Sequence, residues 1–282
     1  MHDLVIRGGT IVDGSGRGKA AGDIAIDDGR LAQVGGKAGP ARAEIDGAGA
    51  IVAPGWVDIH THYDGQVTWD PHLSPSGWHG VTTAVIGNCG VGFAPASPDR
   101  QDWLIGLMEG VEDIPGAALA EGIKWNWESF PEYLDALDAM PRALDVGTQV
   151  PHGAVRAYVM GERGASNQPA NPDDMAGMAA IVEQGLVAGA LGFSTSRTML
   201  HRSVDGVPVP GTFAGADELL AIGQGMKRAG HGVFELATDF GIGGMGGQFG
   251  ADMDWMVRLA RGTGLLVSFI LGQADTAPDE WR

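Results

Sequence analysis

Short hydrophobic runs punctuated by glycine and acidic residues make up the first fifty-odd residues. Gly8 and Gly9 interrupt the first apolar stretch, and Asp27–Gly29 is the kind of turn that joins antiparallel strands. We therefore predict a small β-sandwich domain over residues 1–53, with strands too short to form a large core of their own. The expected strands are Leu4–Arg7, Thr10–Val12, Asp23–Ile26, Arg30–Val34, Ala43–Asp46 and Ile51–Ala53.

After Pro54 and Gly55, apolar runs rich in β-branched residues alternate with segments of helical periodicity. Repeated strand–helix units favour a parallel sheet, so residues 54–282 are expected to form an α/β domain, the first six units of a (β/α)8 barrel. Six strands would leave that barrel open, and we expect further units beyond Arg282. The six expected strands are Trp56–His60, Val81–Gly87, Leu144–Val150, Leu191–Thr195, Val233–Thr238 and Leu265–Leu271.

Helix termini are marked by capping residues. Ser129 with Glu132 forms a capping box, and Asn171 followed by Pro172 has the cap and first-turn pattern of a second helix. Gly230 is placed to end a third helix that begins near Ala216. A fourth helix is expected over Asp252–Arg261.

Charge and composition exclude several function classes. Lysine and arginine number 18 against 35 acidic residues, a formal charge of −17, which argues against nucleic acid and anionic membranes as partners. No apolar run approaches the roughly 20 residues of a membrane helix, and the N-terminus lacks a signal segment. The single cysteine, Cys89, forbids an internal disulfide, so we predict a cytoplasmic protein.

Two motifs carry metal-binding chemistry. His60 and His62 lie two residues apart at the end of the first barrel strand, so their side chains should project together from the edge where barrel enzymes place catalytic groups. Two imidazoles at this spacing can hold one divalent metal ion. Cys89 follows the second strand and should face the same edge, as a metal ligand, as a nucleophile with a histidine base, or as a buried core residue.

Three stretches resemble the amidohydrolase superfamily, and within it the N-acyl-D-amino-acid deacylase (D-aminoacylase) group: Leu4–Gly14, Pro54–Asp64 and Gly87–Pro95. The His-x-His element marks the superfamily, and the stretch around Cys89 is the more specific one. The resemblance implies a metal-bearing (β/α)8 barrel with a small β-sandwich built from both chain ends, of which this chain would be the N-terminal half.

The same resemblance implies a zinc-dependent hydrolase of C–N bonds in amides other than peptides, which deacylates N-acyl-D-amino acids. His60, His62 and Cys89 match the family's metal positions, for one or two Zn²⁺ ions. The family's general acid/base is an aspartate on the eighth strand, so the catalytic residue is expected beyond Arg282. The expected partner is a small N-acyl amino acid, and homo-oligomer formation is left open.

The family also places metal-binding histidines after the fifth and sixth strands, where this chain has none. At the fifth strand Glu235 is the expected extra metal ligand, with Asp239 as the alternative oxygen donor, and at the sixth strand Gln273 would be a weak substitute. Other readings are a cyclic amide hydrolase of the hydantoinase or dihydroorotase kind, and a non-catalytic or degenerate barrel.

Three further residues are candidates for binding substrate. His152 follows the third strand, and Tyr63 follows the His-x-His motif directly, where it and Asp64 could also orient the ligands. Arg197, beyond the fourth strand, has the chemistry to pair with a substrate carboxylate. A loop histidine and a solvated arginine are the simpler interpretations of His152 and Arg197.

Overall fold

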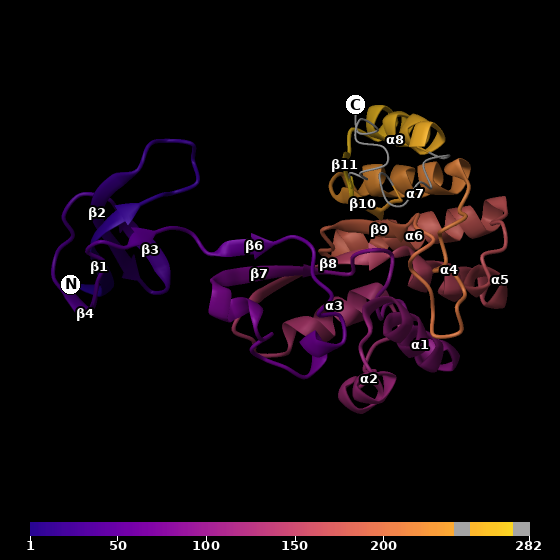
Figure 1. The fold of residues 1–282 in the computed structure, drawn as a ribbon, viewed down its shortest axis with the longest axis horizontal. Coiled ribbons are helices and arrows are strands. Elements are labelled where there is room, and N and C mark those ends of the chain that lie inside the picture. The colour runs from indigo at the N-terminus through magenta and orange to yellow at the C-terminus, as the bar shows by residue number, and fades with distance from the viewer. Residues whose placement is uncertain (240–248, 273–282) are drawn as a thin grey trace. The chain divides into compact units, whose positions relative to one another are not determined.

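The computed structural model describes residues 1–239 and 249–272, and Figure 1 traces the order of their elements. The chain divides into two compact units, Met1–Trp56 and Val57–Arg282. Each unit contains its own sheet, and each is described separately below.

The first unit is built on a five-stranded mixed sheet with the order β3-β2-β1-β4, in which β5 also pairs with β1. β2 runs antiparallel to β1 and to β3, whereas β4 and β5 run parallel to β1. A core of Val5, Ala25 and Ala38 lies under the sheet. The strands are β1 (His2–Ile11), β2 (Ala20–Asp27), β3 (Arg30–Val34), β4 (Ala41–Asp46) and β5 (Ile51–Val52).

One prediction for this unit is wrong in detail. The two apolar runs expected on either side of Gly8 and Gly9 are a single strand, β1. Its register against β2 shifts between Ile6 and Gly9, so the glycines mark an irregularity within the strand and do not end it.

The second unit is a six-stranded half-barrel, as the alternation of strands and helices predicts. Its strands follow one another in sequence order from β6 to β11 (Figure 1), and the pairs from β7 to β11 are parallel. All carboxyl ends of these strands therefore meet at one edge of the sheet. The strands are β6 (Trp56–Asp58), β7 (Val81–Ile86), β8 (Asp145–Pro151), β9 (Gly192–Ser196), β10 (Val233–Ala237) and β11 (Leu266–Phe269).

The predicted caps are in place, and further helices accompany them. Ser129 with Glu132, and Asn171 with Asp174, close capping boxes at the starts of α3 and α6. Gly230 ends α7 in the left-handed conformation. The α-helices are α1 (Gln101–Glu112), α2 (Gly116–Gly122), α3 (Phe130–Asp138), α4 (His152–Met160), α5 (Glu162–Ala165), α6 (Pro172–Ala188), α7 (Ala216–Ala229) and α8 (Phe249–Thr263), and 3₁₀ turns span Gln66–Thr68, Ser76–His79 and Pro98–Arg100.

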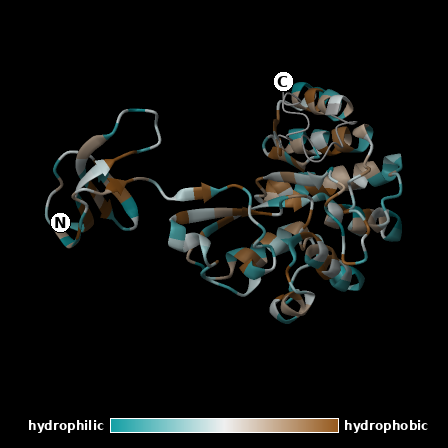
Figure 2. Cartoon of the chain, viewed as in Figure 1, coloured by the Kyte–Doolittle hydropathy of each residue, from teal (hydrophilic) through white to brown (hydrophobic). Residues whose placement is uncertain are grey.

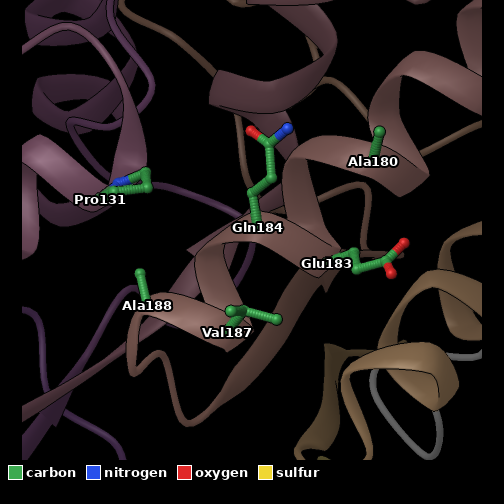
Figure 3. Close-up of a pocket in the computed structure, with 6 residues that line it drawn as sticks. All are labelled: Pro131, Ala180, Glu183, Gln184, Val187 and Ala188. Atoms are coloured by element: carbon green, nitrogen blue, oxygen red, sulfur yellow. The ribbon is translucent and has the colours of Figure 1, made fainter.

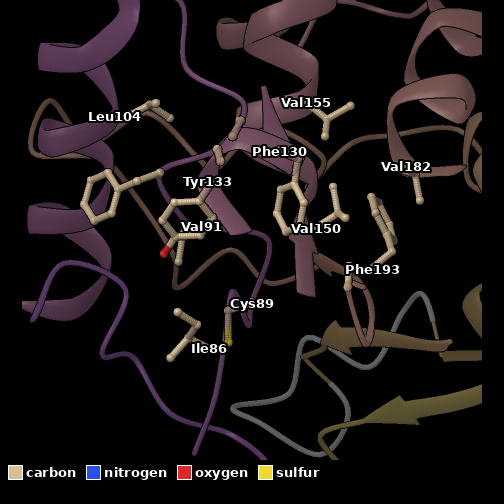
Figure 4. Close-up of a cluster of buried hydrophobic side chains, with 14 of the residues drawn as sticks. Ile86, Cys89, Val91, Leu104, Phe130, Tyr133, Val150, Val155, Val182 and Phe193 are labelled. Carbon is tan, nitrogen blue, oxygen red and sulfur yellow. The ribbon is translucent and has the colours of Figure 1, made fainter. Parts of the chain in front are cut away.

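The core of the half-barrel lies between the sheet and its helices (Figure 4). Phe193 of β9 packs against Phe234 of β10 with ring centroids 5.0 Å apart, and hydrophobic and hydrophilic residues alternate along the covering helices (Figure 2). Cys89 lies in this cluster near Ile86, at the end of β7. In the described part of the chain, no helix has both the length and the apolar character needed to cross a bilayer.

Candidate metal centre

His60 and His62 follow β6, which ends at Asp58, two residues earlier than predicted. Thr61 lies between them and turns away to β7: its N–H and its Oγ1 donate to the carbonyl of Val85, at 2.9 and 2.7 Å. With Thr61 held in this way, both imidazoles point to the other side, with ring centroids 5.2 Å apart. The alternation of a strand therefore persists beyond its last ladder residue.

Cys89 is held in place by a tight loop after β7. Its own φ is +56°, and Gly87 and Gly90 on either side also have positive φ, which glycine adopts without steric cost. Asn88, fully buried, donates to the carbonyls of Thr61 and Val85 at 3.0 and 2.9 Å. The loop is thus tied to the segment between the two histidines.

The three predicted ligands converge. Cys89 Sγ lies 3.2 Å from His60 Nε2 and 3.9 Å from His62 Nε2. Within residues 1–239 and 249–272 this is the one group of three acidic, histidine or cysteine side chains whose ligand atoms all lie within 4.8 Å of one another. Segments distant in the sequence have therefore brought two nitrogen donors and one sulfur donor to a single point.

A carboxylate lies behind each imidazole. Glu235 Oε1 is 3.8 Å from His60 Nδ1, and its Oε2 accepts the backbone N–H of Cys89 at 3.0 Å. Glu112 Oε1 is 3.2 Å from His62 Nδ1. Below, the Cys89 cluster means His60, His62, Cys89, Glu112 and Glu235. Glu235, expected as a ligand, is outside the three-residue group and contacts two of its members from behind.

Burial shifts every titratable group at this point toward its neutral form. It raises the pKa of Glu112 and of Glu235 to about 7 and, with the nearby carboxylates, the pKa of the Cys89 thiol well above its usual range. Burial also lowers the pKa of His62 to about 4, helped by the neighbouring histidines. Asp64, two residues further on, is fully buried, and its pKa rises to about 8 for the same reason.

The residues present fit a divalent metal ion such as zinc. Two imidazole nitrogens and a thiolate are the donors that zinc prefers. The carboxylates of Glu235, Glu112 and Asp64 add to the burial that raises the pKa of the Cys89 thiol and, among the described residues, no lysine or arginine forms an ion pair with Glu112 or Glu235. A cation at the three donor atoms would relieve this repulsion and favour the thiolate.

Two of the predicted substrate-binding residues, His152 and Arg197, have partners within the protein. His152 is fully buried, and its ring nitrogens contact Thr195 Oγ1 at 2.8 Å and Glu218 Oε1 at 2.9 Å. Arg197 is mostly buried and not a solvated side chain: it donates to three carbonyls of residues 211–214 and to Asp252 Oδ1 at 3.1 Å.

Two other acidic or aromatic candidates also have partners. The hydroxyl of Tyr63 contacts Ser76 Oγ at 2.7 Å. Asp239, the alternative oxygen donor, accepts from Thr198 and, at 3.0 Å, from the backbone N–H of Met199. Gln273 lies outside the described residues.

Glu112 is a residue of this site that was not predicted from the sequence. It is the last residue of α1, a helix that the apolar pattern does not predict. Its Oε1 lies 3.2 Å from His62 Nδ1, although the two residues are far apart in the sequence. An unexplained acid at a helix C-terminus, where the macrodipole disfavours negative charge, was the one available signal.

A groove on the surface of α3 and α6 does not coincide with this centre. It has a volume of about 560 Å³ and is lined by residues of α3 and α6, including Glu183, Gln184 and Val187 (Figure 3). None of its lining residues belongs to the Cys89 cluster. The convergence of donor atoms, more than the size of a cavity, identifies the candidate site.

Comparison with known proteins agrees with this geometry. A profile described as the amidohydrolase family matches residues 43–282. The D-aminoacylase of Alcaligenes xylosoxydans xylosoxydans is 34% identical over 194 residues, which cover 68% of this chain and 37% of that protein. The chain thus spans well under two thirds of the length of that relative.

Solved structures give the same result. A crystal structure of D-aminoacylase has a TM-score of 0.73 and 28% identity, covering 95% of this chain and 51% of that one. The N-acyl-D-glutamate deacylase of Bordetella bronchiseptica, in complex with zinc and a phosphonate inhibitor, also has a TM-score of 0.73 at 28% identity, covering 94% and 50%. The half-barrel and its N-terminal sheet therefore correspond to about half of such a protein.

Proposed function

The chain belongs to the amidohydrolase family, and from that premise we propose that it is a zinc-dependent hydrolase of amide C–N bonds other than peptide bonds. The observation that carries the proposal is the convergence of His60, His62 and Cys89, with ligand atoms within 4.8 Å of one another. The finer proposal is deacylation of N-acyl-D-amino acids. Its support is the likeness to the D-aminoacylase and to the N-acyl-D-glutamate deacylase, each a longer protein.

In this proposal His60, His62 and Cys89 are the metal ligands. A bound zinc ion supplies Lewis-acid polarisation of the scissile carbonyl and lowers the pKa of water. Glu235 is assigned to orienting, because its oxygens already face the Cys89 N–H and His60 Nδ1. It fixes Cys89 from the backbone side and leaves the thiol directed at the two imidazoles.

Hydrogen bonds to neighbouring segments hold the loop that carries Cys89. Asp64 Oδ1 accepts the N–H of Gly87 at 2.8 Å, and Ser194 Oγ accepts the N–H of Gly90 at 2.9 Å. Both ends of the loop that carries Cys89 are therefore anchored, Gly87 to the turn that contains Asp64 and Gly90 to the middle of β9. Such anchoring keeps the donor atoms in place and reduces the ordering cost of binding an ion.

A zinc titration with a competing chelator tests the metal site. We expect the wild-type chain to bind zinc, and Cys89→Ser or His62→Asn to weaken binding by more than about 100-fold, because each removes a ligand. His72→Asn is the matched control, since His72 is exposed and outside the cluster. A folded wild-type chain that binds no zinc would refute the metal proposal.

A substrate panel tests the reaction. N-acetyl-D-glutamate, N-acetyl-D-methionine, their L-enantiomers and hydantoin are incubated with the zinc-loaded protein. Release of acetate from the D-substrates alone supports the deacylase, and opening of hydantoin favours the cyclic amide hydrolase. Zinc binding with no turnover of any substrate, by a protein that includes the expected eighth-strand aspartate, favours a non-catalytic barrel.

A further inference from the structure

Glu112 occupies a particular place behind His62. It ends α1, where Asp113 turns the chain into the left-handed conformation at φ +54°. Its Oε1 lies 3.2 Å from His62 Nδ1, while Nε2 of the same ring faces Cys89 Sγ at 3.9 Å. The carboxylate and the thiol thus approach the imidazole from its two opposite nitrogens.

The Nδ1 atom of His62 needs such a partner. It is buried, and in the described part of the chain no well-aligned hydrogen bond reaches it, so Glu112 Oε1, at 3.2 Å, is the oxygen placed to accept a hydrogen bond from an Nδ1–H. A neutral imidazole carries one N–H, and its other nitrogen has the lone pair that binds a metal. An acceptor at Nδ1 therefore selects the tautomer in which Nε2 is free to act as a ligand.

The second carboxylate is not equivalent. Glu235 lies further from its histidine, at 3.8 Å from His60 Nδ1, and it already accepts the Cys89 N–H. Glu112 has no such competing hydrogen bond among those that the structure describes. Its side chain projects from a helix whose inner face, Leu104, Leu107 and Met108, is buried in the core, so its position is rigid.

We propose that Glu112 is a positioning residue that holds His62 as the Nδ1–H tautomer and directs Nε2 toward Cys89. This proposal rests on the proposed function, in which Nε2 of His62 must be free of its proton to bind the metal ion. Removing the carboxylate should leave His62 free to rotate and to carry its proton on Nε2, which opposes metal binding.

The first test is the tautomer itself, measured in metal-free protein by ¹⁵N chemical shifts of the histidine rings at pH 8. We expect Nδ1–H for His62 in the wild type and a shift toward Nε2–H in Glu112→Ala. Glu112→Gln retains an oxygen acceptor and should keep the wild-type tautomer. A His62 tautomer unchanged in Glu112→Ala would overturn the proposal whether or not the protein binds zinc.

The second test is zinc affinity, by chelator competition. We expect Glu112→Ala to weaken binding about 10–100-fold and Glu112→Gln to weaken it less. Glu109→Gln removes a similar charge from the same helix without touching His62, and should change affinity less than twofold. In a His62→Ala background Glu112→Ala should have no further effect, because its action passes through that ring.

The two tests separate two failures. Absence of zinc binding in the wild type, with the expected tautomer shift, refutes the proposed function and leaves the positioning of His62 standing. An equal loss of affinity from Glu112→Ala with and without His62 refutes the positioning role and leaves the metal site standing.

Discussion

Two buried clusters in the half-barrel combine histidine with glutamate. The negative charge of the glutamate is compensated within one cluster and is left uncompensated in the other. In the first, His152 and Arg156 both contact Glu218. Burial by itself would raise the pKa of Glu218, but the hydrogen bond from His152 and the charge of Arg156 outweigh it, and the pKa falls to about 2. This cluster contains its own cation.

The Cys89 cluster contains none. Burial raises the pKa of Glu112 and Glu235 to about 7, and no arginine or lysine offsets it among the ion pairs of the described residues. The same residue types therefore form a charge-compensated cluster around Glu218 and a cluster without a compensating cation around Cys89. The imbalance is what a bound cation would correct, and it distinguishes a candidate metal site from a buried ion pair.

Removing the cation from the balanced cluster should have the largest effect. Arg156→Met leaves the Glu218 carboxylate buried with only His152 as a partner, and we expect a loss of about 3–5 kcal/mol in the free energy of unfolding. Urea denaturation measures it. The control is Arg163→Met, which breaks the more exposed pair with Asp174 and should cost less than about 1 kcal/mol. Equal losses would contradict the larger cost assigned to leaving the buried Glu218 carboxylate without its arginine.

The unbalanced cluster should make the metal-free protein less stable as the pH rises. The folded-state pKa values of Glu112 and Glu235 are about 7 and that of Asp64 about 8, all raised chiefly by burial, whereas unfolded carboxyls titrate near pH 4. Their contribution is complete below about pH 4 and is lost as the pH rises from there through 7 and 8, because over this range the folded state retains protons that the unfolded state has already released. We expect a fall of about 1–2 kcal/mol between pH 7 and 8.5.

Two features make this pH dependence diagnostic. The lowered pKa of His62, about 4, and that of Glu218, about 2, lie below the window and contribute little to the slope. Saturating zinc should flatten or reverse the slope, since a bound cation favours the charged carboxylates and the thiolate. A free energy of unfolding that rises between pH 7 and 8.5 without metal would contradict the assignment of raised pKa values.

The fold was accessible from the sequence wherever local signals agree with the tertiary structure. The six strands and the capped helices α3 and α6 follow from β-branched runs and from Ser129 and Asn171. The helices α1, α2, α4 and α5 were not predicted, and in α1 and α2 the apolar residues are interleaved with glycines and acids over residues 101–122. Burial of their apolar residues in the core stabilises these two helices despite a weak local preference.

The site was accessible only as far as strand ends determine it. His60, His62 and Cys89 each follow a strand, and a parallel sheet brings such residues together. The partners of those residues lie on elements that are distant in the sequence. No local sequence pattern predicts the direction of their side chains. Glu112 at the end of a missed helix and Glu218 under His152 are the two examples.

Tyr63 lies just outside the Cys89 cluster, and its substitution has the smallest expected effect. It directly follows His62, yet its hydroxyl is paired with Ser76 Oγ at 2.7 Å, so it belongs with the satisfied groups despite its place in the sequence. Tyr63→Phe should therefore lower the free energy of unfolding by about 1 kcal/mol, the usual net value of one hydrogen bond, and leave zinc affinity unchanged. Ser76→Ala should cost a similar amount, and the double variant little more than either, because both remove the same bond. A loss of zinc affinity, or a higher KM for an N-acyl-D-amino acid at unchanged stability, would show that Tyr63 takes part in binding the metal ion or the substrate.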